Sequence, residues 1–241
     1  MQIGLLGFLA ESLGLIVGFI VLYLFNIKSG KKMGALYGAT SGLMLAMICF
    51  DIIPEALDKG RQGLVFVGII IGALLGILLD ESADKIEDAL NAKFRTSINK
   101  AGLILVLGIA FHNFPEGFAF GTLGHTSAAE ITSLALILGL HSIPEGIAMA
   151  IPFKKDSTPL NKLTPIGILM GIIMGCGATA GYYLSGLNDN LICTGLGLAA
   201  GLIMYIVCQE LMPESRKIWN GRVTSISTIL GLMFGILLLC H

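Results

Sequence analysis

Two short segments of the chain carry the same combination of an imidazole and a carboxylate. The sequence HNFPEG begins at His112, and the sequence HSIPEG begins at His141. The carboxylates Glu116 and Glu145 each follow their histidine by four residues, so each pair lies on one face of a helix. Imidazole nitrogen with carboxylate oxygen suits Zn²⁺, Fe²⁺, Mn²⁺, Co²⁺ or Cd²⁺, whereas Ca²⁺ prefers a shell of oxygen ligands. The pattern therefore predicts a site for a divalent transition metal.

The residues around each pair strengthen this prediction. Pro115 and Pro144 lack a backbone N–H, so each leaves the carbonyl four residues earlier without its helical partner. Asn113 places an amide oxygen next to His112. Crossing the two helices would direct all these groups into one volume. The ligands predicted from the residues themselves are His112, Asn113, Glu116, His141 and Glu145.

Two further segments repeat the pattern with acids in place of the histidines. One contains Asp51 and Glu55 around Ile-Ile-Pro, and the other contains Glu210 and Glu214 around Leu-Met-Pro. Each is preceded by a Gly-Leu-Met or Gly-Leu-Ile sequence and by a cysteine, so the two segments look like copies of each other. At about 1.5 Å of rise per residue, the first pair lies near the outer end of its helix and the second near the inner end. We therefore expect a path from outside past Asp51, through the central site, and on past Glu210.

The helices that carry these motifs are predicted to cross a membrane. The chain has 241 residues, of which 55% are hydrophobic and only 13% are charged. A spanning helix needs roughly 20 mostly apolar residues. The longest connection, about 81–100, is charged and is expected to be a short amphipathic or flexible cytosolic segment. Eight segments qualify as spans, at about 3–25, 34–57, 63–80, 101–123, 128–151, 163–187, 190–212 and 223–240.

The distribution of basic residues predicts the orientation of these spans. Connections on the cytosolic side of a membrane protein carry an excess of lysine and arginine. With both termini outside, the alternate connections at about 26–33, 81–100, 152–162 and 213–222 are cytosolic and hold thirteen of the 15 basic residues. Only Lys59 and Arg61 lie on the other side. This bias supports both the number of spans and outer termini.

The repeated motifs also predict the internal organisation of the bundle. If spans one to three repeat as spans six to eight, the odd number of helices inverts the second copy, and spans four and five form the centre. Inverted repeats around a site in the middle of the membrane are the usual architecture of secondary transporters. The predicted fold is therefore an all-α membrane bundle of eight helices in a 3+2+3 arrangement. The net charge of −1 gives no reason to expect a nucleic-acid partner.

The double H-x-x-P-E-G motif on successive spans resembles the ZIP (Zrt-, Irt-like) metal transporters, and most of all their bacterial GufA-like branch. The resemblance covers essentially the whole chain. It implies uptake of a metal such as Zn²⁺ toward the cytosol as a transported substrate, with no cofactor. It also implies a bacterial inner-membrane location and a homodimer. Met44 falls where some members have a methionine ligand.

Two positions depart from the family pattern. Ser142 stands where the family usually has Asn or Asp, and span six, around residues 175–179, lacks the glutamate that many members use in a second metal site. We therefore expect one strong metal-binding site with a weaker metal-binding site beside it. Ser142 is an additional candidate ligand.

Two other classes of function fit some of the same residues. A buried metal with an open position could activate water, as in an intramembrane metal-dependent hydrolase. Against that class, the chain has no H-E-x-x-H motif, no nucleophile-type serine motif and no evident general base besides the expected ligands. Alternatively, the polar pairs could only hold helices together in a structural or regulatory membrane protein. Metal flux into proteoliposomes and metal binding by glutamate variants separate these readings.

Overall fold

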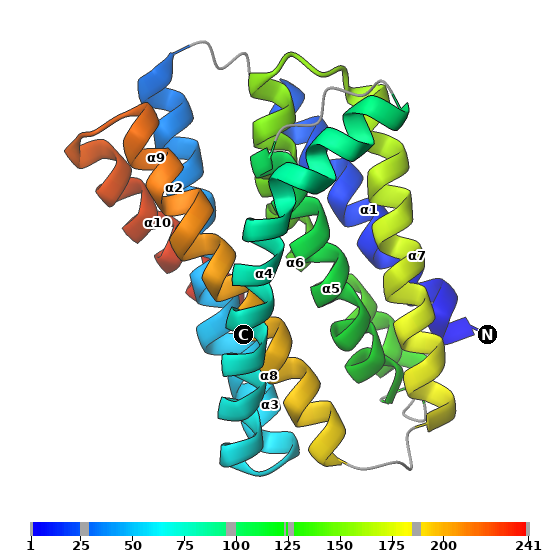
Figure 1. Ribbon diagram of the computed structural model, residues 1–241. Helices are drawn as coiled ribbons and strands as arrows, with labels where there is room; N and C mark the ends of the chain where they lie inside the picture. Colours follow the sequence, from blue (N-terminus) through cyan, green and yellow to red (C-terminus); the bar gives the residue numbers. More distant parts are fainter. Residues whose placement is uncertain are drawn as a thin grey trace.

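The computed structural model describes residues 2–24, 29–94, 100–122, 124, 128–184 and 189–239 (Figure 1). The side chains of His141 and of some other residues within the helices lie outside this description. All regular structure in the described residues is helical, as predicted. The helices are α1 (Gln2–Leu24), α2 (Gly30–Met47), η1 (Ile48–Ile52), α3 (Ile53–Lys59), α4 (Gln62–Phe94), α5 (Lys100–Thr122), α6 (Ala128–Lys155), α7 (Leu160–Leu184), α8 (Asp189–Ile206), η2 (Val207–Leu211), α9 (Met212–Ile218) and α10 (Arg222–Leu239).

Seven helical segments in the described part of the chain are long and apolar enough to cross a membrane. They correspond to the first seven predicted spans, with α2, η1 and α3 forming one continuous segment and α8, η2 and α9 another. The eighth predicted span corresponds to α10, whose apolar part, Arg222–Leu237, is shorter than the others. The chain is therefore a multi-pass helical membrane protein.

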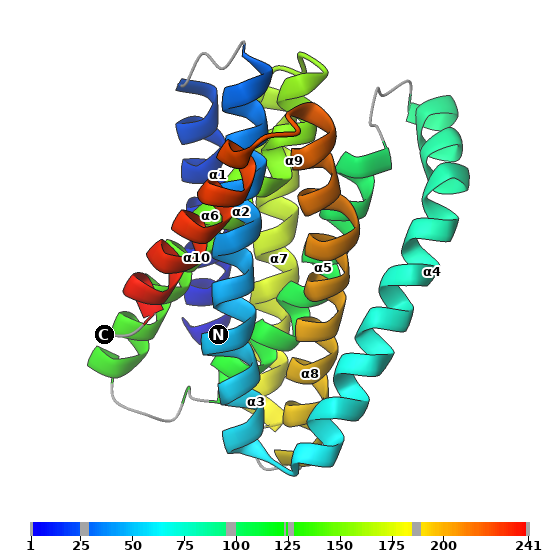
Figure 2. The same cartoon turned by 90° about the vertical axis from the view of Figure 1, so that its left-hand side faces the viewer.

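The third predicted span, 63–80, agrees with the membrane-compatible segment Gln62–Ser82, but the helix that contains it is longer. The charged segment 81–100 was expected to be a separate connection, but α4 continues without a break to Phe94. Figure 2 shows α4 as a single helix along one edge of the molecule. Residues 81–94 contain several alanines, glutamates and lysines but no glycine or proline, so the helix has no local reason to end where its apolar part ends. The loss of hydrophobicity marks the end of the span, not the end of the helix.

The second and seventh spans each contain a π-helical turn. These turns, Ile48–Ile52 and Val207–Leu211, lie at corresponding places in the two copies of the acidic motif. Pro54 and Pro213 follow them, and each removes the N–H that would bond the carbonyl of Phe50 or Gln209. A wider turn accommodates that missing bond. Such turns within α-helices occur frequently at functional sites.

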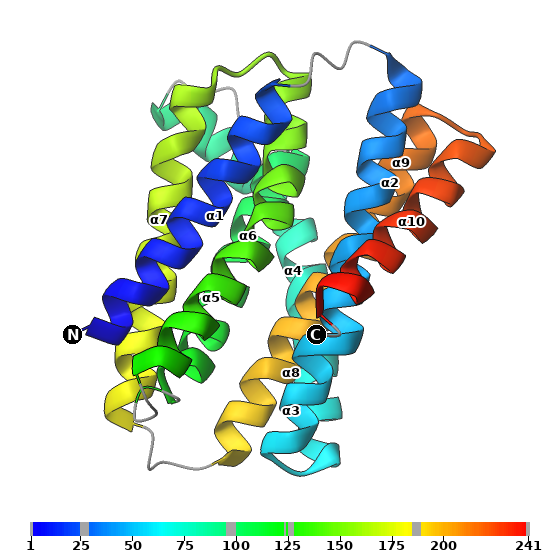
Figure 3. The same cartoon turned by 180° about the vertical axis from the view of Figure 1, so that it is seen from behind.

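The helices pack in two groups, which Figures 1 and 3 show on opposite sides of the molecule. In one group, α1 packs against both α6 and α7, and α5 packs against α7. In the other group, α4 packs against α8, and α10 packs against α2. Contacts of α5 with α8 and of α6 with α2 join the groups. The two helices that carry the histidine motifs therefore belong to one group and contact the helices that carry the acidic motifs in the other.

Glycines allow the helices around the motifs to approach closely. A methyl group added at Gly14 of α1 would collide with the carbonyl oxygen of Gly139 in α6, and one at Gly146 of α6 would collide with that of Leu15. The α5–α7 pair has the same design, since a methyl group at Gly117 would meet the carbonyl oxygen of Met174. Small residues of this kind replace the hydrophobic driving force that membrane helices lack. The contacts fix the rotation of α1 and α7 against the two motif helices.

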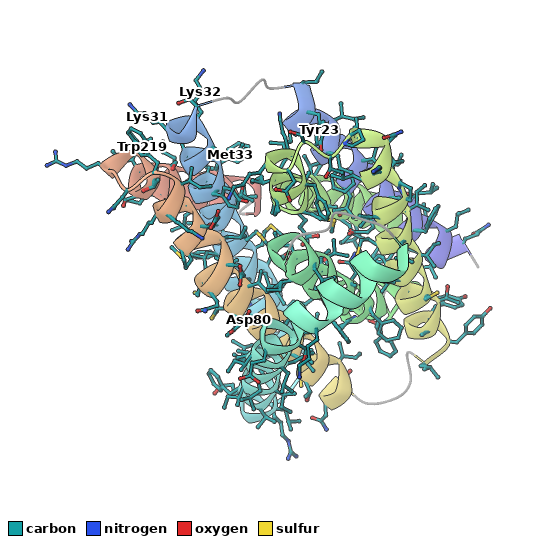
Figure 4. The ribbon with its side chains drawn as sticks, turned by 45° about the horizontal axis from the view of Figure 1, so that its top comes forward. Tyr23, Lys31, Lys32, Met33, Asp80 and Trp219 are labelled. Carbon is teal, nitrogen blue, oxygen red and sulfur yellow. The ribbon has the colours of Figure 1, made fainter. Side chains whose placement is uncertain are left out.

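One end of the molecule collects basic and interfacial side chains. Figure 4 shows Lys31, Lys32 and Trp219 at the end where α2 begins and α9 ends. At the same end, the Tyr23 hydroxyl donates a 2.5 Å hydrogen bond to the carbonyl oxygen of Thr158, which joins the end of α1 to the α6–α7 connection. Tryptophan, tyrosine and lysine favour the boundary between lipid and water.

Candidate metal centre

The side chains of the two histidine motifs meet inside the bundle. His112 and Glu116 lie one helical turn apart on α5, with His112 Nε2 2.9 Å from Glu116 Oε2. The same nitrogen lies 3.3 Å from Oε1 of Glu145, which comes from α6. The His112 and Glu145 side chains are fully buried, and that of Glu116 is 14% exposed. Two carboxylates from different helices therefore converge on one imidazole.

The second histidine belongs to the helix that carries Glu145. His141 is part of α6, but its side chain lies outside the described residues. Within the described part of the chain, no group of three or more His, Cys, Asp or Glu side chains has the spacing of an assembled metal site. Glu116 and Glu145 instead contact the imidazole directly, so an ion would have to enter between these groups.

Asn113 has a free acceptor in the same region. Its side chain is fully buried, and its Oδ1 accepts no hydrogen bond from the described residues. Nδ1 of His112 also has no hydrogen-bond partner among them. Leaving a buried polar atom unpaired costs about 1–3 kcal/mol, so such atoms call for an explanation. An amide oxygen and an imidazole nitrogen are both groups that can bind a metal ion.

A third buried carboxylate, Glu11, comes from α1. Its Oε1 accepts a 2.7 Å hydrogen bond from Nδ2 of Asn113, and its Oε2 accepts a 2.6 Å bond from the hydroxyl of Ser142. Glu11, Asn113 and Ser142 are all fully buried. Glu11 thus contacts the residue that follows the histidine in each motif. The sequence favours a polar helix contact or a vestibule position for Glu11, and the two hydrogen bonds confirm a polar contact between helices. Which residues it contacts could not be predicted from the sequence.

The charge of this region favours a cation. Two carboxylates, those of Glu116 and Glu145, contact the imidazole of His112, and the carboxyl group of Glu11 contacts the neighbouring Asn113. A protonated imidazole would carry one positive charge against these two carboxylates. Buried charges in lipid are costly, by about 2.5–3.5 kcal/mol each on insertion scales, and persist where they are paired. A divalent ion would supply the missing positive charge.

The predicted pathway acids lie nearer the surface. Asp51, Glu55, Glu210 and Glu214 are all partly exposed, the first two on η1 and α3 and the last two on η2 and α9. Glu214 binds Lys155 of α6, with 2.7 Å between Oε1 and Nζ, and its other oxygen lies 3.7 Å from Nζ of Lys217. Met44 of α2 is buried in the main hydrophobic core.

Comparisons with known proteins identify a family. Residues 80–241 match the family model described as ZIP Zinc transporter. The chain is 29% identical over 204 residues to zinc transporter ZupT of Corynebacterium aurimucosum, a match that covers 78% of this chain and 77% of the relative. It is 28% identical over 234 residues to ZupT of Chlorobaculum parvum, covering 88% and 86%. It is also 27% identical over 186 residues to zinc transporter GufA of Myxococcus xanthus, covering 77% and 70%.

These matches agree with the resemblance seen in the motifs. All three relatives carry names of zinc transporters, and GufA itself is among them. None of the three names describes an enzyme, so they favour the transporter reading over the hydrolase.

Proposed function

This chain belongs to the ZIP zinc transporter family and carries divalent metal ions across a membrane, and we propose that it does so through the buried site between α5 and α6. The ion is a substrate of the protein and not a resident cofactor. Met44 and Ser142 are kept as additional candidate ligands. The proposed ligands are His112, Asn113, Glu116, His141 and Glu145.

One observation supports this site above the others. His112 Nε2 lies within 3.3 Å of carboxylate oxygens from two different helices, in a region with almost no exposure. Imidazole and carboxylate groups together prefer transition metals such as zinc. The free Oδ1 of Asn113 adds a neutral oxygen ligand beside them. A binding set drawn from two helices can also release its ion when the helices shift.

The proposed path runs from outside past Asp51 and Glu55, through the central site, and past Glu210 and Glu214 to the cytosol. The partial exposure of all four acids supports this path. The basic end of the molecule would face the cytosol, because positive residues favour that side. We also propose that both termini lie outside, that the membrane is a bacterial inner membrane and that the protein is a homodimer. Accessibility of introduced cysteines from each side of the membrane tests the topology, and cross-linking in membranes tests the dimer.

We also propose that the bundle is a 3+2+3 inverted repeat. Its support is the pairing of contacts. The packing of α4 on α8 matches that of α10 on α2, and the packing of α5 on α7 matches that of α6 on α1. The two π-helical turns fall at equivalent positions of the second and seventh spans.

The test is uptake of Zn²⁺ into proteoliposomes that contain the purified protein. Wild-type protein should accumulate the ion and the His112→Ala variant should not, with Fe²⁺, Mn²⁺ and Cd²⁺ as competitors. Phe114→Ala is the matched control, since Phe114 lies on the same helix and is 45% exposed. Equal uptake by the His112→Ala and wild-type proteins would overturn the proposed site.

A further inference from the structure

Glu11 connects the two histidine motifs from a third helix. It accepts hydrogen bonds from Asn113 on α5 and from Ser142 on α6, at 2.7 and 2.6 Å. These residues hold the same position in their motifs, directly after His112 and His141. The Ser142 hydroxyl also lies 2.9 Å from the carbonyl oxygen of Leu138, but it has only one proton to donate. Glu11 therefore links the two motifs at equivalent positions, Asn113 in the first and Ser142 in the second.

The packing of α1 fixes where Glu11 lies. Gly14 and Gly18 of α1 sit so close to α6 that a methyl group at either would collide with a carbonyl oxygen there. One turn before Glu11 along α1, Gly7 packs near α7, where an added methyl group would lie 3.3 Å from the side chain of Ala178. Gly7, Glu11, Gly14 and Gly18 follow the spacing of one helix face. Close contacts of α1 with α6 and α7, before and after Glu11 along the helix, thus fix where its carboxyl group lies.

These contacts decide which end of the Asn113 amide is free. An asparagine side chain offers two donors on its nitrogen and one acceptor oxygen. Nδ2 of Asn113 donates to Oε1 of Glu11 at 2.7 Å, so the nitrogen is the end of the amide that Glu11 holds. The oxygen is then the end that has no partner. In agreement with this, the buried Oδ1 of Asn113 accepts no hydrogen bond from the described residues. A reversed amide would turn its N–H groups toward the cation and repel it.

We propose that Glu11 is a positioning residue of the metal site, which orients Asn113 so that its amide oxygen faces the ion and which holds Ser142 of the second motif in line with it. This inference rests on the proposed transport site. Glu11 acts through Asn113 and does not need to touch the ion itself. Residues that orient metal ligands in this way typically contribute about 10- to 100-fold to metal affinity.

The test is a double-mutant cycle on metal binding. Cd²⁺ affinity is measured by calorimetry on purified, detergent-solubilised full-length protein. Glu11→Gln should weaken binding about 10-fold, because a glutamine can also present an N–H and no longer fixes the amide. In the Asn113→Ala background the same change should have an effect of less than about 2-fold, since coupled residues are not additive. Equal effects of Glu11→Gln in both backgrounds would overturn the inference.

A reciprocal exchange gives a second test that a merely structural role would not pass. Asn113→Asp alone places two carboxylates against each other and should weaken Cd²⁺ binding. Adding Glu11→Gln lets the glutamine amide donate to one oxygen of Asp, which leaves the other oxygen for the ion. The double variant should therefore bind more tightly than Asn113→Asp alone. A double variant that binds more weakly than both single variants would contradict the proposal.

The controls separate this inference from the proposed function. Ser12→Ala changes the neighbouring buried residue of α1, whose hydroxyl oxygen has no hydrogen-bond partner among the described residues, and should leave Cd²⁺ affinity unchanged. Loss of Cd²⁺ binding in His112→Ala together with wild-type affinity in Glu11→Gln would contradict the positioning role of Glu11 but not the proposed site. Wild-type binding in His112→Ala would sink the proposed site itself.

Discussion

The four Pro-Glu motifs occupy two kinds of surroundings in this molecule. On α5 and α6 the proline lies within a continuous α-helix, and Glu116 and Glu145 turn inward to a common imidazole. On the second and seventh spans the proline follows a π-helical turn, and the acids are partly exposed. Similar sequences have therefore produced a buried binding cluster in the centre and accessible carboxylates on either side.

This difference indicates that the central and outer motifs have different roles. Buried acids in contact with an imidazole can hold an ion tightly, because water no longer competes with them. Partly exposed acids attract an ion but release it easily. The wider turns also change which way the following residues face, since one extra residue rotates the rest of a helix by about 100°. The central copies should control binding, and the outer copies should control access.

The largest expected effect follows removal of a central charge. Glu145→Gln keeps the size of the side chain but removes a buried carboxylate that lies 3.3 Å from His112. Initial Zn²⁺ uptake should fall by about 100-fold or more, which corresponds to about 2.7 kcal/mol. Proteoliposome flux measures this, and uptake within a few-fold of wild type would remove Glu145 from the site.

A smaller effect is expected from an outer acid. Glu210→Gln should lower uptake about 3- to 10-fold at low Zn²⁺ and much less at saturating Zn²⁺, because the partly exposed carboxylate of Glu210 raises the local ion concentration. The decrease should shrink further at high ionic strength, since salt screens exposed charges. Measuring uptake over a range of Zn²⁺ and salt concentrations tests this. A loss as large as that of Glu145→Gln would erase the contrast between the two kinds of motif.

The π-helical turn gives a test of the backbone. Pro213→Ala restores an N–H that can bond the Gln209 carbonyl, so the turn at Val207–Leu211 should close into regular α-helix. The resulting rotation of Glu210 should reduce uptake about 2- to 5-fold while thermal stability stays equal or rises. Pro165→Ala on α7 is the matched control, because no π-helical turn precedes that proline. Unchanged transport in Pro213→Ala would mean that the turn has no role in access.

The smallest expected effect concerns the ion pair that joins an outer motif to a central helix. Lys155 is half exposed where it binds Glu214, so Lys155→Ala should change stability by only about 0.2–1 kcal/mol. Uptake should stay within about 2-fold of wild type, because surface pairs of this kind are screened by solvent. Thermal unfolding in detergent and flux assays measure both. A drop of 10-fold would instead make this pair a part of the path.

Much of the fold could be predicted because the membrane imposes simple rules. The apolar segments located seven spans, and the i, i+4 spacing put His112 and Glu116 on one face. Hydropathy did not predict the end of α4, because a helix can continue in water past its apolar part. The π-helical turns were missed because Pro115 and Pro144 show that a proline in a span does not by itself require one.

Glu11 shows most clearly where the sequence was insufficient. A single acid in an otherwise apolar span, on one face with Gly7, Gly14 and Gly18, was a signal for a close helix contact. This signal did not show which residues Glu11 would contact. By itself, the sequence determined that the chain lies in a membrane and that each motif pairs an imidazole with a carboxylate, because both depend on local composition and helical spacing. Only the tertiary structure decided that three helices bring Glu11, Asn113 and Ser142 together, because that depends on how closely their backbones pack.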